Sequence, residues 1–213
     1  MYKPSHFDES RTEVLHAFVA QHPLAAVVAA GAQGMIANHI PLMLEPGRGG
    51  AGSLKGHIAR ANSMWQDVPD GAEVLAIFQG PSQYISPNWY PSKREHGKVV
   101  PTWNYAVVHA RGTIRWNHDL AWLRRLVGEL TDRHERGQAA PWRVSDAPEE
   151  FIQQMLAAIV GLEITITSLS GKWKLSQNRN PADRAGVIAA LAARSDAAAQ
   201  EMALLVEQAN KKR

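Results

Sequence analysis

The chain has 213 residues, 45% of them hydrophobic and 20% charged, which is typical of one large globular domain that buries a sizeable core. Its net charge of +3 is compatible with contact with nucleic acid but does not predict it. The absence of cysteine excludes disulfides, thiolate catalysis and cysteine-based zinc sites.

The first part of the chain predicts one helix and three strands. A helix over residues 9–21 has Asp8 as its expected N-cap, and His22-Pro23 ends it. Strands are expected over residues 24–30, 35–44 and 53–58, with a turn over 31–34 and a loose loop over 45–52. Pro41 cannot donate to a ladder, so an edge or a bulge is expected there. A short helix follows near residue 65.

The second part predicts further strands and most of the helices. Strands are expected over residues 73–79, 105–116 and 162–169, with Gly112 as a bulge in the second. Helices are expected over residues 120–133, 148–160, 183–194 and 195–210. Because the strands come mostly as hairpins, the pattern favours a mainly β (α+β) fold, an antiparallel barrel with peripheral helices. We expect residues 1–180 to form the domain and the alanine-rich residues 181–213 to pack on it.

Residues 78–104 form an unusual stretch in which aromatic, proline and amide side chains alternate. It is expected to be a long loop joining two strands, and loops of that length are uncommon unless they are functional or mobile. Tyr and Trp rings with Asn, Gln and Ser suit a planar ligand rich in heteroatoms. The alternative is that the aromatic side chains only hold the loop against the barrel.

Several common motifs are absent. The glycine run over residues 47–52 leads into a strand and has no Gly-Lys-Ser/Thr end, so it predicts a hairpin loop and not a phosphate loop. His39, His57 and His109 lie on separate predicted strands, and we expect structural hydrogen bonds there and no metal. No apolar run approaches a membrane span and Met1-Tyr2-Lys3-Pro4 opens no signal-peptide pattern, so a cytoplasmic protein without a membrane partner is expected.

Two polar clusters carry more information. Lys55-Gly56-His57-Ile58-Ala59-Arg60-Ala61-Asn62 is a strand end, a small-residue turn and a helix start, which suits a phosphate monoester. The alternative is that its basic side chains are merely solvated. Gly171-Lys172-Trp173-Lys174-Leu175-Ser176-Gln177-Asn178-Arg179 gathers polar and basic side chains around one Trp directly after a strand, which favours a binding function.

These clusters together resemble the PaiB family, whose members are known as FMN-binding negative transcriptional regulators. The resemblance covers residues 1–180, in order. It rests on Met1-Tyr2-x-Pro4-x-His6-Phe7, the Gly56 to Asn62 turn, Phe78-Gln79-Gly80-Pro81-x-x-Tyr84-Ile85-Ser86-Pro87-x-Trp89-Tyr90, Val100-Pro101-Thr102-Trp103-Asn104-Tyr105 and the Gly171 to Arg179 cluster. Ser63 stands where the family often has proline, and residues 181–213 carry no family motif.

The resemblance implies an FMN-binding split β-barrel that works as a homodimer. By analogy with split barrels, Asn38, His39, His57, Arg60 and Asn62 would hold the ribityl chain and phosphate. The remaining candidates would approach the flavin ring, some of them from the partner subunit: Gln79, Trp103, Asn104, Lys172, Trp173, Lys174, Ser176, Gln177 and Arg179. No catalytic residue is identified.

Three functional hypotheses remain open from the sequence. The first is an FMN-binding regulator that contacts DNA directly or acts on it indirectly, although no helix-turn-helix or basic helix stripe stands out. The second is an FMN-dependent oxidoreductase, similar to flavin reductases, that uses the same pocket. The third is a flavin-free structural dimer with a vestigial pocket.

Overall fold

A computed structural model describes residues 1–32, 34–47 and 50–211. The strands are β1 (Asp8–Glu9), β2 (Leu24–Gly31), β3 (Gly34–Pro41), β4 (Met43–Gly47), β5 (Gly50–Ala59), β6 (Glu73–Ile85), β7 (Thr102–Asn117) and β8 (Ile159–Lys174). The helices are α1 (Thr12–Gln21), α2 (Met64–Asp67), α3 (Ser92–His96), α4 (Leu120–Glu135), α5 (Glu149–Ala157), α6 (Pro181–Ala192) and α7 (Ala197–Lys211). Gln33 of the expected turn and Arg48-Gly49 of the expected loop lie outside the described residues.

The strands form one sheet in the order β3-β2-β6-β7-β8-β5-β4, and β1 pairs with β8. The pairings of β2 with β3 and β6, and of β5 with β4 and β8, are antiparallel. Its first and last strands, β3 and β4, are consecutive in the chain and separated by Leu42 alone. Pro41, which has no N–H to donate, is the last residue of β3. The predicted antiparallel fold with peripheral helices is confirmed.

By its internal contacts the chain divides into two compact units. Unit 1 comprises Met1–Phe18, Gln79–His109 and Ser170–Arg213, and unit 2 comprises Val19–Phe78 and Ala110–Leu169. Strands β6, β7 and β8 each contribute residues to both units. The packing of residues 181–213 on one domain made of residues 1–180 stays a prediction.

Unit 2 has an apolar interior formed by alternate residues of its strands. The fully or almost fully buried side chains are Ala25, Val27, Ala29, Ile40, Leu42, Leu54, Val74, Ala76, Phe78, Ala110, Ile114, Val160, Leu162 and Ile164. At Gly112 a Cβ would lie 2.3 Å from the carbonyl oxygen of Thr165 on β8, so this glycine permits a close approach of two strands. Helices α4 and α5 share a smaller core of Leu123, Ile152 and Leu156. Asp119 caps α4 by accepting from the backbone N–H of Trp122 at 2.6 Å.

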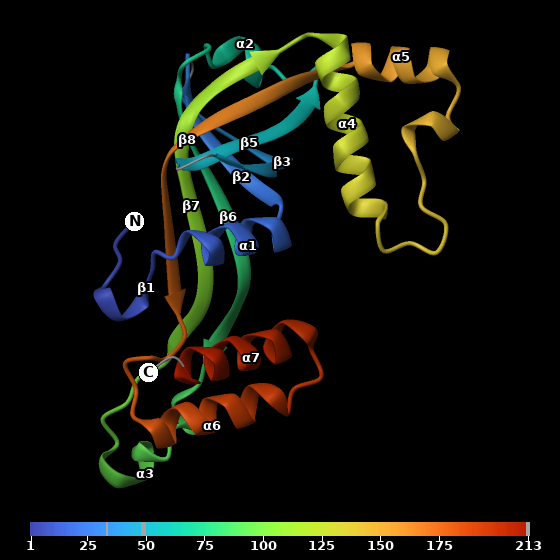
Figure 1. Cartoon of the computed structure of the whole chain (residues 1–213). Helices are drawn as coiled ribbons and strands as arrows, with labels where there is room; N and C mark the ends of the chain where they lie inside the picture. The colour runs from blue at the N-terminus through green and yellow to red at the C-terminus, as the bar shows by residue number, and fades with distance from the viewer. Residues whose placement is uncertain (33, 48–49, 212–213) are drawn as a thin grey trace. The chain divides into compact units, whose positions relative to one another are not determined.

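Unit 1 is built around its last two helices, α6 and α7, which pack side by side (Figure 1). Their apolar faces enclose a core of Ile85, Tyr90, Leu175, Val187, Leu191, Ala199, Met202, Ala203 and Val206. Leu175 directly follows β8, Ile85 is the last residue of β6, and Tyr90 lies in the connection between β6 and β7. The alanine-rich C-terminal segment therefore completes the core beneath the predicted binding segment of residues 171–179.

Four predicted boundaries are wrong. Asp8 does not cap a helix, because Asp8–Glu9 pairs with β8 and α1 begins only at Thr12. The expected loop after residue 79 is shorter, because β6 continues to Ile85 and β7 already begins at Thr102. The helix expected through residue 160 ends at Ala157. Residues 171–174, expected as loop, extend β8.

Among the described residues, no helix is long and apolar enough to cross a membrane.

Candidate cofactor site

The fourteen predicted site residues fall into two groups. Five belong to unit 2: Asn38, His39, His57, Arg60 and Asn62. Nine belong to unit 1: Gln79, Trp103, Asn104, Lys172, Trp173, Lys174, Ser176, Gln177 and Arg179. Each group is described within its own unit, and the assignment of these residues to FMN stays a prediction.

In unit 2 the two asparagines form a connected pair at the start of α2. The side-chain amide of Asn62 donates to the side-chain oxygen of Asn38 at 2.8 Å. The side-chain oxygen of Asn62 accepts the backbone N–H of Met64 at 3.0 Å, so it satisfies one of the free donors at the helix start. Asn38 also contacts the Sδ atom of Met64 at 3.3 Å. These contacts join β3 to the turn that follows β5.

Arg60 lies in this turn, and its side chain is bonded to the chain itself. Its Nε donates to the carbonyl of Ala157 at 2.7 Å and its Nη2 donates to the carbonyl of Ile159 at 2.9 Å. Its Nη1 lies 3.5 Å from Nδ1 of His118. Ala157 ends α5, where carbonyls lack helical partners and carry partial negative charge, and Ile159 begins β8, so the guanidinium stabilises the junction of these two elements. A phosphate at Arg60 would share the guanidinium with these carbonyls.

The two histidines of this group differ in environment. His39 is exposed on β3, whereas His57 on β5 is half-buried. Burial lowers the pKa of His57, so its imidazole is neutral at pH 7 and can either donate or accept a hydrogen bond.

In unit 1 a buried polar contact joins β7 to the segment after β8. The side-chain amide of Asn104 donates to Oγ of Ser176 at 3.0 Å, and the two residues are 0% and 3% exposed. Ser176 has a φ of +63°, in the left-handed region that non-glycine residues rarely adopt. A strained backbone held by a buried hydrogen bond is often found where a ligand is bound.

The turn after β8 is closed by one side chain. Oε1 of Gln177 accepts the backbone N–H of Leu175 at 2.7 Å, and its Nε2 donates to the carbonyl of Trp173 at 2.6 Å. The ring of Trp173 packs against Phe18 with centroids 4.9 Å apart. The predicted binding segment therefore includes both the turn and the glutamine whose side chain holds the turn in place.

Gln79 and Trp103 lie at the surface of unit 1. The ring of Trp103 is 54% exposed and meets Tyr84 edge to face with centroids 6.3 Å apart. This exposed aromatic pair could stack with a planar ligand, in keeping with the composition of the stretch.

Three basic side chains of the predicted site in unit 1 contact rings and neutral oxygens. Lys172, only 8% exposed, donates to the carbonyl of Tyr2 at 3.0 Å and lies 5.5 Å and 5.3 Å from the ring centroids of Tyr2 and Tyr105. Lys174 donates to Oγ1 of Thr102. The guanidinium of Arg179 lies 4.7 Å from the ring centroid of Tyr90. Cation–π contacts of this kind stabilise a cation without neutralising it.

These cations also act on one another. Burial lowers the pKa of Lys174, and the positive charges of Lys172 and Arg179 lower it further, against the opposing influence of Tyr105. Among the described residues, no carboxylate forms an ion pair with any of the three cations. Three cations that lie close enough to act on one another, beside buried amide and hydroxyl groups, fit an anionic, oxygen-rich ligand such as FMN.

The tyrosines and Thr102 that contact the cations were not among the predicted site residues. One signal in the sequence could have indicated part of this arrangement. Lys172 and Lys174 alternate with Trp173, a period of two that places both lysines on one face if the strand continues.

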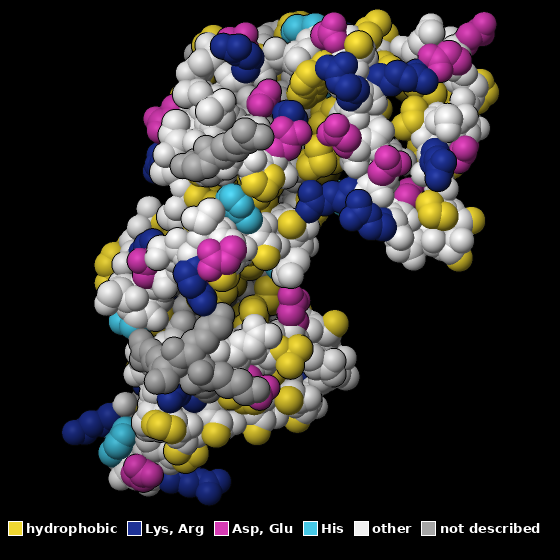
Figure 2. Space-filling model, in the orientation of Figure 1, with side chains coloured by type: hydrophobic (Ala, Val, Ile, Leu, Met, Phe, Trp, Pro, Cys, Tyr) yellow, Lys and Arg dark blue, Asp and Glu magenta, His cyan; other side chains and the backbone are white. Residues whose placement is uncertain are grey.

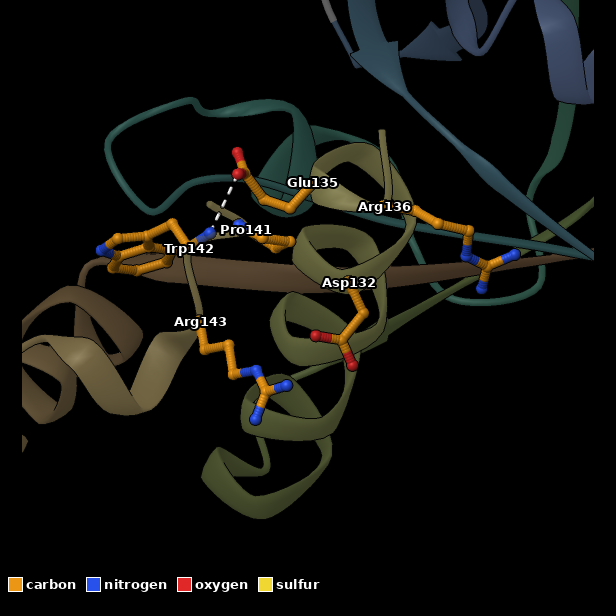
Figure 3. A pocket seen from close by; sticks show the side chains of 6 residues that line it. All are labelled: Asp132, Glu135, Arg136, Pro141, Trp142 and Arg143. Atoms are coloured by element: carbon orange, nitrogen blue, oxygen red, sulfur yellow. Dashed lines mark hydrogen bonds between the residues drawn. The ribbon is translucent and has the colours of Figure 1, made fainter. Parts of the chain in front are cut away.

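A hollow of about 340 Å³ lies at the C-terminal end of α4, and none of the residues that line it is a predicted site residue (Figure 3). Its lining is Asp132, Glu135, Arg136, Pro141, Trp142 and Arg143. The backbone N–H of Trp142 donates to the carboxylate of Glu135 at 3.0 Å. Carboxylates and arginines balance each other here, and side chains of both signs mingle around α4 (Figure 2). This charge balance distinguishes the hollow from the cationic group of unit 1.

Comparison with known structures defines the class of fold. The FAD and heme binding protein from Mycobacterium smegmatis matches with a TM-score of 0.57 and 19% identity, over 78% of this chain and 73% of its own. A flavocytochrome from Azotobacter vinelandii also matches with a TM-score of 0.57, at 14% identity, over 78% of this chain and 69% of its own. The fold is therefore the split barrel of flavin-binding proteins.

Comparison of sequences defines the family. A family model described as "Putative FMN-binding domain" matches residues 1–168. The protease synthase and sporulation protein PAI 2 of Bacillus subtilis is 33% identical over 215 residues, covering 100% of this chain and 99% of the relative. An uncharacterised protein of Emericella nidulans is 32% identical over 223 residues, covering 88% of this chain and 89% of that protein. The chain belongs to this FMN-binding family and is PaiB-like, which confirms the resemblance, with FMN as the cofactor.

Proposed function

We propose that the protein is an FMN-binding regulator of PaiB type that acts in the cytoplasm as a homodimer. The observation that carries this proposal is the end-to-end similarity to PAI 2, whose name refers to protease synthesis and sporulation. A similarity over the whole length includes the C-terminal helices that complete the core of unit 1. The cationic group of unit 1 supports the binding of FMN because it offers positive charge to the phosphate or to an anionic ring.

An apolar sheet face of unit 2 supports the homodimer. Cross-strand pairing places one set of side chains of β2, β3 and β6 on a common face, and all of them are exposed or half-exposed. They are Leu24, Ala26, Val28, Ala30, Met35, Ala37, Pro41, Leu75 and Ile77, with His39 as the polar member. Leu24 and Met35 are 57% and 73% exposed. Contiguous apolar faces seldom stay open on a monomer, and a second copy of the chain would cover this one.

Equilibrium titration with FMN and FAD tests the cofactor proposal. We expect a yellow complex with FMN and weaker binding of FAD, which is titrated in parallel because a protein named as FAD-binding shares the fold. Binding of neither flavin below millimolar concentration would overturn the proposal. Light scattering on the same preparation tests the homodimer, for which a mass near the 23.4 kDa of one chain would be the contrary result.

A second pair of measurements separates the regulator from the oxidoreductase. The FMN-loaded protein is mixed with NADH or NADPH and the absorbance of the nicotinamide is followed. In parallel, its binding to DNA fragments is measured by gel shift at two salt concentrations. A regulator in direct contact with DNA is expected to shift specific fragments and to leave the nicotinamide unoxidised. Rapid oxidation without DNA binding would favour the enzyme instead.

A further inference from the structure

One carboxylate in unit 1 is almost completely buried, although it lies in the C-terminal segment that carries no family motif. Asp183, in the first turn of α6, is 2% exposed. Burial of an ionised carboxylate is costly unless hydrogen bonds compensate it. Asp183 accepts the backbone N–H of Ser92 at 3.1 Å, Oγ–H of Ser92 at 2.7 Å and the side-chain amide of Asn180 at 3.1 Å.

These bonds exceed what a helix start requires. The side-chain oxygen of Asn180 already accepts the backbone N–H of Asp183 at 2.8 Å and caps α6 without further help. The two bonds to Ser92 instead connect α6 to the first residue of α3, which is 91 residues away in the sequence. Close packing accompanies them, since a Cβ at Gly186 would lie 2.0 Å from the carbonyl oxygen of Trp89. Asp183 therefore clamps the connection between β6 and β7 onto α6.

The hydrogen bonds of Asp183 hold the chain next to both partners of the cation–π contact between Arg179 and Tyr90. Tyr90 lies two residues before Ser92, and Arg179 lies directly before Asn180. The backbone N–H of Arg179 donates to the carbonyl of Ser176 at 2.9 Å, which ties it to the strained residue of the predicted site. The charge of Asp183 reaches this contact, because together with burial it raises the pKa of Tyr90, against the effect of Arg179.

We propose that Asp183 is a positioning residue for the cofactor, which fixes Tyr90 and Arg179 in the arrangement that presents the cationic group of unit 1 to FMN. This inference rests on the proposed function, because it assumes that residues 172–179 bind the flavin. Asp183 does not touch the cofactor in this proposal. Its action passes through Ser92 to Tyr90 and through Asn180 to Arg179.

The test compares Asp183→Asn with a matched control, Asp196→Asn. Asp196 lies just before α7 and accepts the backbone N–H of Ala199 at 2.8 Å, so it is also a carboxylate at a helix start, but it is bonded to Arg194 and Gln83 and not to the Tyr90 connection. We expect Asp183→Asn to raise the Kd for FMN about tenfold and to change the visible circular dichroism of the bound flavin. Asp196→Asn is expected to leave both unchanged, even where it lowers the melting temperature.

Ser92→Ala serves as a second variant, because it removes one bond of the clamp and keeps the cap between Asn180 and Asp183. It is expected to weaken FMN binding in the same direction, and it decides the question if Asp183→Asn does not fold. Equal FMN affinity in the wild type and in every folded clamp variant would overturn the positioning role while leaving the proposed function intact. Absence of FMN binding by the wild type would overturn both.

Discussion

Two basic regions of the molecule contain similar side chains and use them differently. In unit 2, Arg60 donates to two backbone carbonyls and Lys55 pairs with Glu45. In unit 1, Lys172, Lys174 and Arg179 contact rings, a carbonyl and a hydroxyl, and none is paired with a carboxylate among the described residues. A cation bonded to its own chain stabilises the fold, whereas cations that repel one another favour an added anion. Residue type alone therefore does not separate a structural arginine from a ligand-binding one.

The largest effect that tests this comparison is expected from Arg60→Ala. The substitution removes two charge-assisted hydrogen bonds, which the carbonyls of Ala157 and Ile159 accept. Each such bond contributes about 1.5–3 kcal/mol, and because the side chain is half-exposed we expect a total loss of about 3 kcal/mol in the free energy of unfolding. Urea denaturation of the flavin-free protein measures it.

Arg115→Ala is the matched control, because Arg115 is exposed on β7 of the same unit. Its effect is expected within about 0.5 kcal/mol. If Arg60→Ala is as stable as this control but binds FMN poorly, Arg60 belongs with the ligand-binding cations and the contrast between the two regions fails.

Lys174→Met is expected to have the next largest effect, on binding and not on folding. Removal of one cation from the group in unit 1 should weaken FMN binding by about 2 kcal/mol, which corresponds to roughly 30-fold in Kd. The stability of the flavin-free protein is expected to be unchanged or slightly higher, because repulsion from Lys172 and Arg179 disappears. Fluorescence titration and urea denaturation separate these two results, and a variant that loses stability but keeps its affinity would contradict them.

The pH dependence of the free energy of unfolding provides a second test of Lys174→Met. The pKa of Lys174 lies below its ordinary 10.5 in the folded protein, so the unfolded chain retains this proton to higher pH than the folded one. The free energy of unfolding therefore rises with pH between the lowered pKa and 10.5. Lys174→Met should lose this rise, which denaturation curves across the alkaline range will show.

Much of the fold could be predicted because its signals are local. The amphipathic pattern over residues 120–133 marks α4, and the apolar runs mark the central parts of the strands. The extension of β6 to Ile85 was missed for a physical reason. Gly80-Pro81 interrupts a strand by local propensity, but Ile85 beyond it is buried against Val187 and Leu191, so tertiary packing overrides the local signal.

The residues of the candidate site could be predicted from their composition, but their hydrogen-bond partners could not. Residues 172–179 stand out because they concentrate polar side chains after a strand. Nothing in the sequence shows that Arg60 bonds to residues 97 and 99 positions away, or that Asp183 bonds to Ser92. Long-range hydrogen bonds leave no periodicity in the sequence, so these partners become visible only in the structure.

The smallest expected effect concerns the strained residue of unit 1. Ser176→Ala and Ser176→Gly both remove the hydrogen bond to buried Asn104, but only glycine relieves the positive φ. We expect the glycine variant to be more stable than the alanine variant by about 1 kcal/mol in thermal or urea denaturation. Ser86, with a φ of −76° and a capping bond to Asn88, is the control at which alanine should equal or exceed glycine. Equal stability of the two Ser176 variants would mean that the left-handed backbone stores no strain. The case for a ligand-binding turn in unit 1 would then rest on its cations and on the buried Asn104–Ser176 bond, without the strained backbone.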